Sequence, residues 1–222
     1  MFIVLEGIDG CGKSTYAGML VDWLNETHCA ILTTEPTKNR IGSFIREILK
    51  GHVEVDAKTL ALLFTADRYE HQKEIKDSLD CGKIVVCERY YHSTIAYQSA
   101  LGVDKKWIVE MNKFARKPDL ALFIDVDPEV AVKRTSTNEI FENLDFLKKV
   151  RENYMKQEIR VNQIDSRDKH LPLANDVPKL RCSFADTVCD EKSQTRVTVI
   201  DGNGTIGEVF ERIKKRVDNG LC

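Results

Sequence analysis

The chain has 222 residues, of which 42% are hydrophobic, and this length and composition suit one α/β domain with a substantial core. Its formal net charge of −2 gives no electrostatic reason to expect nucleic acid or an anionic membrane as a partner. No apolar run approaches the length of a membrane span and the first residues lack the pattern of a secretory signal, so we expect a soluble, cytoplasmic protein.

The first predicted strand, 2–5, leads into a glycine-rich turn and then into an amphipathic stretch, 16–26, that has the pattern of a helix. The turn matches GxxxxGK[ST] in its full strand–turn–helix context, which is typical of a phosphate-binding P-loop. Glycines let successive backbone N–H groups converge on one anion, Lys13 adds a mobile positive charge, and the hydroxyl of Ser14 suits Mg²⁺. The residues predicted to hold nucleotide phosphates are Gly7, Gly10, Cys11, Gly12, Lys13, Ser14 and Thr15.

A second strand is predicted at 30–33 and runs into Thr34-Glu35-Pro36-Thr37, where the proline ends it. Helical spacing follows at 41–49, and Asp56 is predicted to cap a long helix that extends to about residue 80. One face of this helix contains Leu60, Leu63, Phe64, Asp67, Arg68 and His71. Polar residues on that face indicate either a solvated helix edge or the border of a polar cleft, and the pattern alone favours the solvated edge.

The third predicted strand, 84–87, ends in Glu88 and Arg89. Charges at the carboxyl end of a buried parallel strand lie where open α/β sheets bind ligands. The remaining predicted elements are strands at 120–124 and 197–200 and helices at 93–100, 104–115, 129–134, 141–157 and 205–217. Strands that alternate with helices predict one doubly wound α/β domain, in which a five-stranded parallel sheet has helices on both faces.

Two features are not explained by this alternation. Periodicity is lost from 158 to 196, so we expect an insertion that has some local structure or forms a disordered flap. The chain has seven cysteines, an odd number without the spacing of a zinc site, and we expect free thiols. A disulfide between Cys182 and Cys189 is the alternative.

Taken together, these motifs resemble the thymidylate kinases, most closely their archaeal-type members, over about 1–157 and 196–217. The matching stretches are 2–10, 34–37, 62–68, 88–90, 93–98, 117–120 and 125–130. The resemblance implies a P-loop nucleoside monophosphate kinase fold and transfer of the γ-phosphoryl group of ATP, with Mg²⁺, to thymidine 5′-monophosphate (dTMP) in dTTP biosynthesis. Because the family is usually dimeric, a homodimer is expected.

The resemblance also implies roles for individual residues on the acceptor side. Asp9 would position the acceptor near its sugar hydroxyl or the bound arginine, Phe64 would stack on the thymine, and Arg68, one helical turn later, would hydrogen-bond the base edge. The residues implied to bind dTMP are Asp9, Glu35, Pro36, Arg46, Phe64, Arg68, Arg89, Ser93, Thr94, Tyr97, Gln98 and Glu142.

Charged residues at the strand ends are implied to act on the phosphates. Arg89 would clamp the acceptor phosphate, with Arg46 as a second candidate. Glu88 stands where the family has aspartate, and it would hold Mg²⁺ through water or orient Arg89; a salt-bridged structural acid is the alternative. Asp125 is a rival acid at the end of another strand.

The sequence departs from the family in its catalytic cation. Kinases of this group supply an arginine from the P-loop or from a lid, yet positions 8–11 contain no basic residue. The lid is implied to span 134–142, where Arg134 is the candidate, with Arg151 behind it. The residues expected to be catalytic are therefore Lys13, Arg89, Asp9 and Arg134.

Two other functions remain open at this point. One is a kinase for another, modified pyrimidine deoxynucleoside monophosphate, which the altered Glu88 and the 158–196 insertion would permit. The other is a regulatory P-loop ATPase or GTPase. The guanine-reading Asn-Lys-x-Asp pattern is absent after Asn112-Lys113, and no second lysine precedes Lys13 in the loop, so both kinds of switch protein are disfavoured.

Overall fold

The computed structural model describes residues 1–134, 141, 143–160 and 196–221. All five predicted strands are present, each within one residue of its predicted bounds at either end. They are β1 (Phe2–Glu6), β2 (Ala30–Thr34), β3 (Ile84–Glu88), β4 (Leu120–Asp125) and β5 (Arg196–Asp201). They form a single sheet in the order β2-β3-β1-β4-β5, and every neighbouring pair is parallel.

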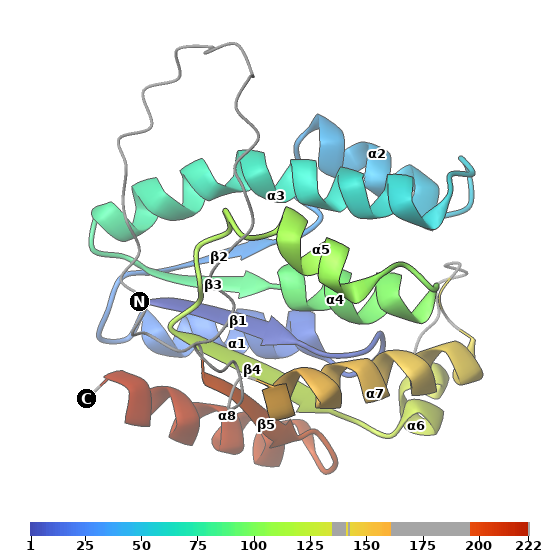
Figure 1. Cartoon of the computed structure of the whole chain (residues 1–222). Helices are drawn as coiled ribbons and strands as arrows, with labels where there is room; N and C mark the ends of the chain where they lie inside the picture. Colours follow the sequence, from blue (N-terminus) through green and yellow to red (C-terminus); the bar gives the residue numbers. More distant parts are fainter. Residues whose placement is uncertain (135–140, 142, 161–195, 222) are drawn as a thin grey trace, which may run out of the picture.

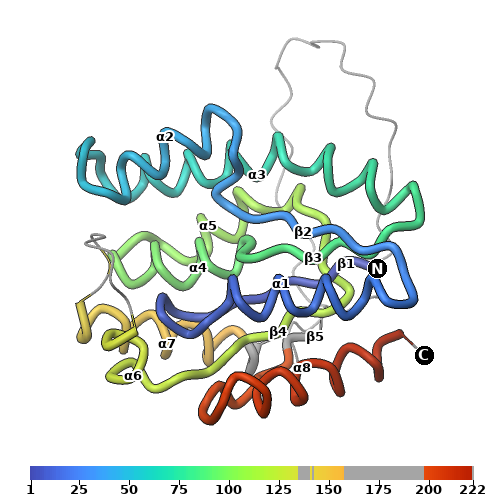
Figure 2. Tube along the Cα trace, turned by 180° about the vertical axis from the view of Figure 1, so that it is seen from behind, coloured from blue at the N-terminus to red at the C-terminus, as the bar shows by residue number. Residues whose placement is uncertain are grey.

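Helices cover the sheet on both sides, as the alternating pattern predicts. The helices are α1 (Lys13–Leu24), α2 (Arg40–Leu49), α3 (Ala57–Asp80), α4 (Tyr91–Ala100), α5 (Lys105–Met111), α6 (Pro128–Arg134), α7 (Leu144–Arg160) and α8 (Ile206–Leu221). In Figure 1 the helices α4 and α7 lie in front of the sheet, and Figure 2 shows α1 and α8 on the opposite face. The long helix α3 lies beside α2, beyond the β2 side of the sheet (Figure 1).

Strand β1 explains why the site lies where it does. All five of its residues are buried, because it pairs with β3 on one side and β4 on the other and is covered on both faces. The chain leaves β1 toward β2, while β4 lies on its other side, so the strand order reverses at β1. Open parallel sheets bind ligands at the carboxyl ends of strands next to such a reversal.

Several predicted helices have different bounds from those expected; α1 begins three residues before the predicted 16–26, and α8 continues four residues beyond the predicted 205–217. The helix predicted at 141–157 begins at Leu144, because the Asn143 side chain accepts a hydrogen bond from the backbone N–H of Asp145 at 2.9 Å and so caps it. It continues to residue 160, three residues into the predicted insertion. The helix predicted at 104–115 ends at Met111.

Several other expectations can be checked directly. The predicted cap Asp56 accepts hydrogen bonds from the backbone N–H groups of Lys58 and Thr59, at 2.8 and 2.9 Å. Among the described residues, Cys11, Cys29, Cys81 and Cys87 are free, as expected. The pairing of Cys182 with Cys189, and most of the 158–196 insertion, lie outside the described residues. No described helix is long and apolar enough to span a membrane.

Candidate active site

The P-loop connects β1 to α1 and surrounds a cavity of about 610 Å³. Gly10 and Gly12 have φ angles of 80° and 91°, in the left-handed region, and a Cβ at Gly10 would lie 2.2 Å from the carbonyl oxygen of Ala131. Lys13 is buried, and its Nζ donates to the carbonyl oxygen of Ile8 at 2.7 Å. This donor cavity is lined by Asp9, Gly10, Gly12, Lys13, Ser14, Thr15, Tyr16, Glu88, Arg89, Arg134, Gly204, Thr205 and Ile206.

The far wall of the donor cavity was not predicted from the sequence. It consists of Gly204, Thr205 and Ile206, which connect β5 to α8, together with Tyr16 on α1. Open parallel sheets bind ligands at the carboxyl ends of their strands, and this connection follows such an end, as Glu88 does. It contains no charged motif, and its place in the site follows from the docking of β5 against β4.

Ser14 and Glu88 meet on one side of the donor cavity. The hydroxyl of Ser14 donates to Glu88 Oε1 at 2.8 Å, although the two residues are far apart in the sequence. Mg²⁺ in phosphoryl-transfer sites is held by one or two carboxylate or hydroxyl groups together with substrate phosphates and water. This oxygen pair beside the P-loop fits such an ion. The rival acid, Asp125, is instead paired with Arg151, whose Nε and Nη2 lie 2.5 and 2.7 Å from the carboxylate oxygens.

Arg89 lies directly after β3. Among the described residues it is the only non-glycine residue with a positive φ, 65°. Its guanidinium forms an ion pair with Asp9 and donates to the hydroxyl of Ser93 at 3.0 Å. The hydroxyl of Tyr97 donates to the other oxygen of Asp9 at 2.7 Å. Burial acts to raise the pKa of the Asp9 carboxyl, but the positive charges of Arg89 and Lys13 outweigh it and hold that pKa below its ordinary value.

A second pocket opens beside the first, between α3, α4 and the loop after β2. Its lining residues are Asp9, Glu35, Pro36, Leu49, Phe64, Arg68, Arg89, Tyr90, Ser93, Thr94, Tyr97, Gln98 and Phe141. Ten of the twelve residues predicted to bind the acceptor are among them. Leu49, Tyr90 and Phe141 were not predicted, because Leu49 and Phe141 fall in predicted helices, where an apolar side chain looks like an ordinary core residue, and Tyr90 is recognised only as part of the matching stretch 88–90.

Arg46, another predicted acceptor residue, does not line this pocket. The guanidinium of Arg46 donates to the backbone carbonyls of Pro36 and of Thr37, the latter at 2.5 Å, and so supports the loop after β2. Glu142 lies outside the described residues, as does most of the predicted lid. Arg134, the last residue of α6, lines the donor cavity.

Gln98 is the most unusual polar side chain of the acceptor pocket. It is fully buried, and within the described part of the chain neither its Nε2 nor its Oε1 has a hydrogen-bond partner. A buried amide that lacks partners costs free energy on the order of 1–3 kcal/mol for each group. The described part of the pocket wall thus presents an unpaired hydrogen-bond donor and an unpaired acceptor side by side. Such a pair complements the edge of a planar amide or imide.

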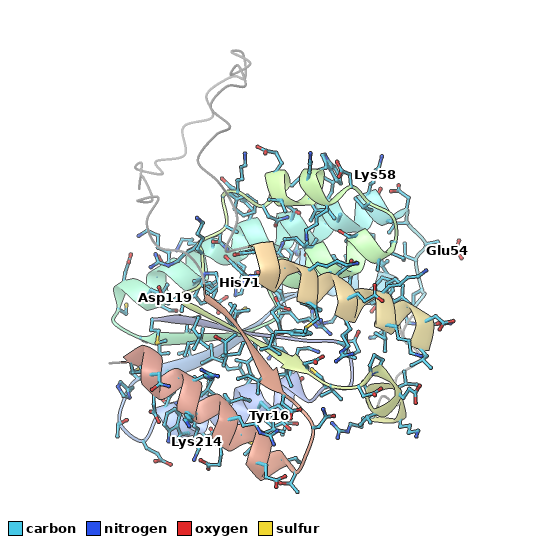
Figure 3. The ribbon with its side chains drawn as sticks, turned by 60° about the horizontal axis from the view of Figure 1, so that its bottom comes forward. Tyr16, Glu54, Lys58, His71, Asp119 and Lys214 are labelled. Atoms are coloured by element: carbon cyan, nitrogen blue, oxygen red, sulfur yellow. The ribbon has the colours of Figure 1, made fainter. Side chains whose placement is uncertain are left out.

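The polar face of α3 is buried, so the solvated-edge interpretation is wrong. Arg68 is 1% exposed, and its Nε and Nη2 lie 2.8 and 2.7 Å from Glu35 Oε2. Its Nη1 donates to Asn112 at 2.6 Å and its Nη2 to Thr94 at 3.0 Å. Figure 3 shows His71 in the interior between α3 and the sheet, where its Nδ1 lies 3.0 Å from Glu35 Oε1. The cluster holds Arg68 in one orientation at the pocket wall.

Asp9 and Arg89 line both the donor cavity and the acceptor pocket, so the two spaces meet at this ion pair. One space offers backbone donors, a lysine and a hydroxyl–carboxylate pair, and the other is lined by aromatic side chains together with buried polar groups. An arrangement of this kind can bring two phosphates together, because the guanidinium at the boundary neutralises charge and fixes direction.

Comparisons with known proteins agree with this geometry. A family model described as "Thymidylate kinase" matches residues 5–174. The "Probable thymidylate kinase" of Methanocaldococcus jannaschii is 52% identical over 155 residues, which cover 70% of this chain and 80% of that relative. That of Thermococcus onnurineus is 44% identical, covering 70% and 83%. A solved thymidylate kinase structure from Candida albicans matches with a TM-score of 0.75 at 25% identity, over 99% of this chain and 92% of that one.

Proposed function

The chain belongs to the thymidylate kinase family, and from this membership we infer that it transfers the γ-phosphoryl group of ATP to dTMP, giving ADP and thymidine 5′-diphosphate in dTTP biosynthesis. The observation that carries this function is the meeting of the donor cavity and the acceptor pocket at Asp9 and Arg89. Nothing favours a different monophosphate or a regulatory ATPase.

On the donor side, the backbone N–H groups of the P-loop and the start of α1 bind the phosphates of ATP. Lys13 moves from the carbonyl of Ile8 to the β- and γ-phosphates, whose charge is a stronger partner than a neutral carbonyl. Ser14 and Glu88 would hold Mg²⁺, which supplies charge neutralisation at the β- and γ-phosphates.

On the acceptor side, Arg89 holds the phosphate of dTMP beside the P-loop. Its guanidinium is already oriented by Asp9 and Ser93, so little ordering is needed when the acceptor binds. A phosphate oxygen of dTMP then attacks the γ-phosphorus in line, the bond to the β–γ bridging oxygen breaks, and ADP leaves. No covalent enzyme intermediate is needed.

The base is read by the buried polar groups of the acceptor pocket. The amide of Gln98 can accept from the N3–H of thymine and donate to a neighbouring carbonyl, while Arg68 offers positive charge to O4 and Phe64 stacks on the ring. Cytosine presents a donor where thymine presents O4, so the same groups would reject it.

Arg134 is our proposed source of the additional catalytic cation. Arg134 is exposed and lines the donor cavity, whereas Arg151 is held by Asp125. Glu142 is retained as a predicted acceptor residue.

We also propose that the protein is a cytoplasmic homodimer. The exposed thiols of Cys29 and Cys81 are unpaired, which suits a reducing compartment. Apolar side chains on α3 and α5, among them Leu62 and Tyr69, are 51% and 57% exposed and offer a surface for a second copy.

A monophosphate panel tests the function directly. The purified chain is incubated with ATP, Mg²⁺ and dTMP, dUMP, dCMP, dAMP or dGMP, and ADP release is coupled to NADH oxidation while the nucleotide products are separated chromatographically. We expect dTMP to give the highest kcat/KM. Loss of activity in the Lys13→Ala variant, purified in the same way, would exclude contaminating kinases. Diphosphate formation from another monophosphate but not from dTMP would overturn the proposal.

A further inference from the structure

The backbone at Arg89 is strained and has to be held by its surroundings. Its φ of 65° is unusual for a residue with a long side chain, and such conformations persist only where neighbouring contacts enforce them. The N–H of Arg89 donates to the carbonyl of Leu5 at 2.9 Å, which fixes the residue on its strand side. On the other side, the N–H of Tyr90 donates to the side chain of Glu6 at 2.8 Å.

Glu6, the last residue of β1, is 2% exposed and collects donors from the segment after Arg89. Besides Tyr90, it accepts from the backbone N–H of Ser93 at 3.3 Å, from the Ser93 hydroxyl at 2.6 Å and from the Tyr154 hydroxyl at 2.9 Å. Two of these donors are N–H groups at the first turn of α4, where a helix dipole favours negative charge. The carboxylate therefore caps α4 from a neighbouring strand.

The groups around Glu6 favour its ionised form. Burial acts to raise the pKa of its carboxyl, but the nearby His92 imidazole, the Ser93 donors and the charge of Arg89 outweigh that effect and leave the pKa below its ordinary value. An ionised carboxylate can only accept hydrogen bonds, so its four donors are all oriented toward it.

Ser93 connects Glu6 to the guanidinium of Arg89 through two hydrogen bonds. A serine hydroxyl has one hydrogen, and here it points at Glu6 Oε2. The lone pairs of the same oxygen therefore remain for Arg89, whose Nη1 donates to it at 3.0 Å. The Tyr154 hydroxyl lies 2.8 Å from the Ser93 oxygen and 2.9 Å from Glu6 Oε2, so its one hydrogen is shared between these two acceptors.

Tyr154 comes from α7, and neither it nor Glu6 lines the donor cavity or the acceptor pocket. The Tyr154 ring stacks on Phe123, with centroids 4.7 Å apart, so removing only its hydroxyl leaves the packing in place. Their hydrogen bonds reach the site through Ser93 and the backbone of Tyr90. The Tyr154 ring also meets the ring of Tyr97 with centroids 6.4 Å apart, a contact that Tyr154→Phe preserves.

We propose that Glu6 and Tyr154 are positioning residues for the phosphate clamp: through Ser93 and the start of α4 they fix the backbone and guanidinium of Arg89 for the acceptor's phosphate. This proposal rests on the inferred function, in which Arg89 binds the phosphate of dTMP. It assigns no direct contact with substrate to either residue.

The test compares two ligands that differ only in the phosphate. The affinities of thymidine and dTMP are measured by titration calorimetry on the full chain and on Tyr154→Phe, Glu6→Gln and Arg89→Ala, and the ratio of the two dissociation constants reports the clamp alone. We expect the preference for dTMP to fall about threefold to tenfold in Tyr154→Phe and about tenfold or more in Glu6→Gln, while thymidine affinity stays within about twofold. Asn153→Ala is the matched control, because it removes a hydrogen bond from α7 to the Ala96 carbonyl in α4 without touching the hydrogen bonds of Glu6.

The outcomes separate this inference from the function it rests on. If Arg89→Ala leaves the preference for dTMP unchanged, the clamp role of Arg89 fails. If Arg89→Ala abolishes the preference and Tyr154→Phe and Glu6→Gln do not reduce it, the positioning role is refuted. Equal weakening of both ligands, or an equal effect in Asn153→Ala, would also refute it, since either would indicate general loosening. Thermal melts show whether Glu6→Gln folds; if it does not, Tyr154→Phe alone decides.

Discussion

Removing Glu35 should destabilise the fold more than removing its partner Arg68. The two side chains are 3% and 1% exposed, and the nearest guanidinium nitrogen lies 2.7 Å from the carboxylate. In Glu35→Ala the guanidinium stays charged, because arginine cannot release its proton in a protein. In Arg68→Met the remaining carboxyl can take up a proton, and it still has His71 at 3.0 Å.

The magnitudes follow from these contacts. Breaking a buried ion pair from one side costs about 3–5 kcal/mol. Since Arg68 keeps Asn112 and Thr94 as neutral acceptors, we expect about 3 kcal/mol for Glu35→Ala, at the lower end of that range. For Arg68→Met we expect a smaller cost of about 2 kcal/mol, because Asn112 and Thr94 each lose a donor but no unpaired charge remains buried. The double variant should be at least about 1 kcal/mol more stable than Glu35→Ala, because it contains no unpaired buried charge.

Urea unfolding at pH 7 measures the free energy of unfolding of all three variants. In thermal unfolding, the melting temperature of Glu35→Ala should be about 6–12 °C lower than that of the unaltered chain. Asp77→Ala on the same helix is the control: its ion pair with Lys73 is 2.6 Å long but exposed, and we expect a change of about 0.5 kcal/mol or less. If Glu35→Ala costs no more than Arg68→Met, or if the two effects simply add, the stranded-charge reasoning is wrong.

Four further changes probe the site and the fold. Arg89→Ala should lower kcat/KM for dTMP about 100- to 1,000-fold, measured by the coupled assay, and an unchanged value would remove this residue from the active site. Glu88→Gln should raise the Mg²⁺ concentration needed for half-maximal rate, whereas the same Mg²⁺ dependence as the unaltered chain would favour a structural acid. Gln98→Leu should weaken dTMP binding and lower the ratio of the affinities for dTMP and dCMP. An unchanged ratio would contradict base reading by this amide. Because the folded-state pKa of Glu6 lies below its ordinary 4.5, its ionised form stabilises the fold above that pH and the contribution is lost on acidification; Glu6→Gln should therefore show a flatter acid limb in pH-dependent unfolding.

The strand ends were predictable because the parallel sheet itself selects them. Glu88 and Arg89 follow a short β-branched run, and the rule for open sheets assigns such residues to the ligand edge without knowledge of their partners. The P-loop was predictable for a similar reason, since its glycines and Lys13 act largely through local backbone geometry.

Contacts between distant parts of the chain could not be predicted in this way. Asn112 occurs in a stretch that reads as an ordinary helix, and its hydrogen bond to Arg68 spans 44 residues. Tyr154 has the spacing of a core residue, and only the fold shows that its hydroxyl reaches Glu6, 148 residues away. Local patterns identify elements and their ends, whereas the pairing of buried polar groups depends on how the elements pack.

The placement of Gly204–Ile206 in the donor cavity bears on how the enzyme is made. All described residues that line the acceptor pocket have been synthesised once the chain reaches Phe141, but the donor cavity lacks a wall until β5 and the start of α8 have been added. The donor cavity is therefore completed only by the last eighth of the polypeptide, after all the described residues of the acceptor pocket. A chain truncated before β5 would keep the P-loop and the residues of the acceptor pocket but lack one wall of the donor cavity, so ATP binding is the step that such a truncation should weaken first.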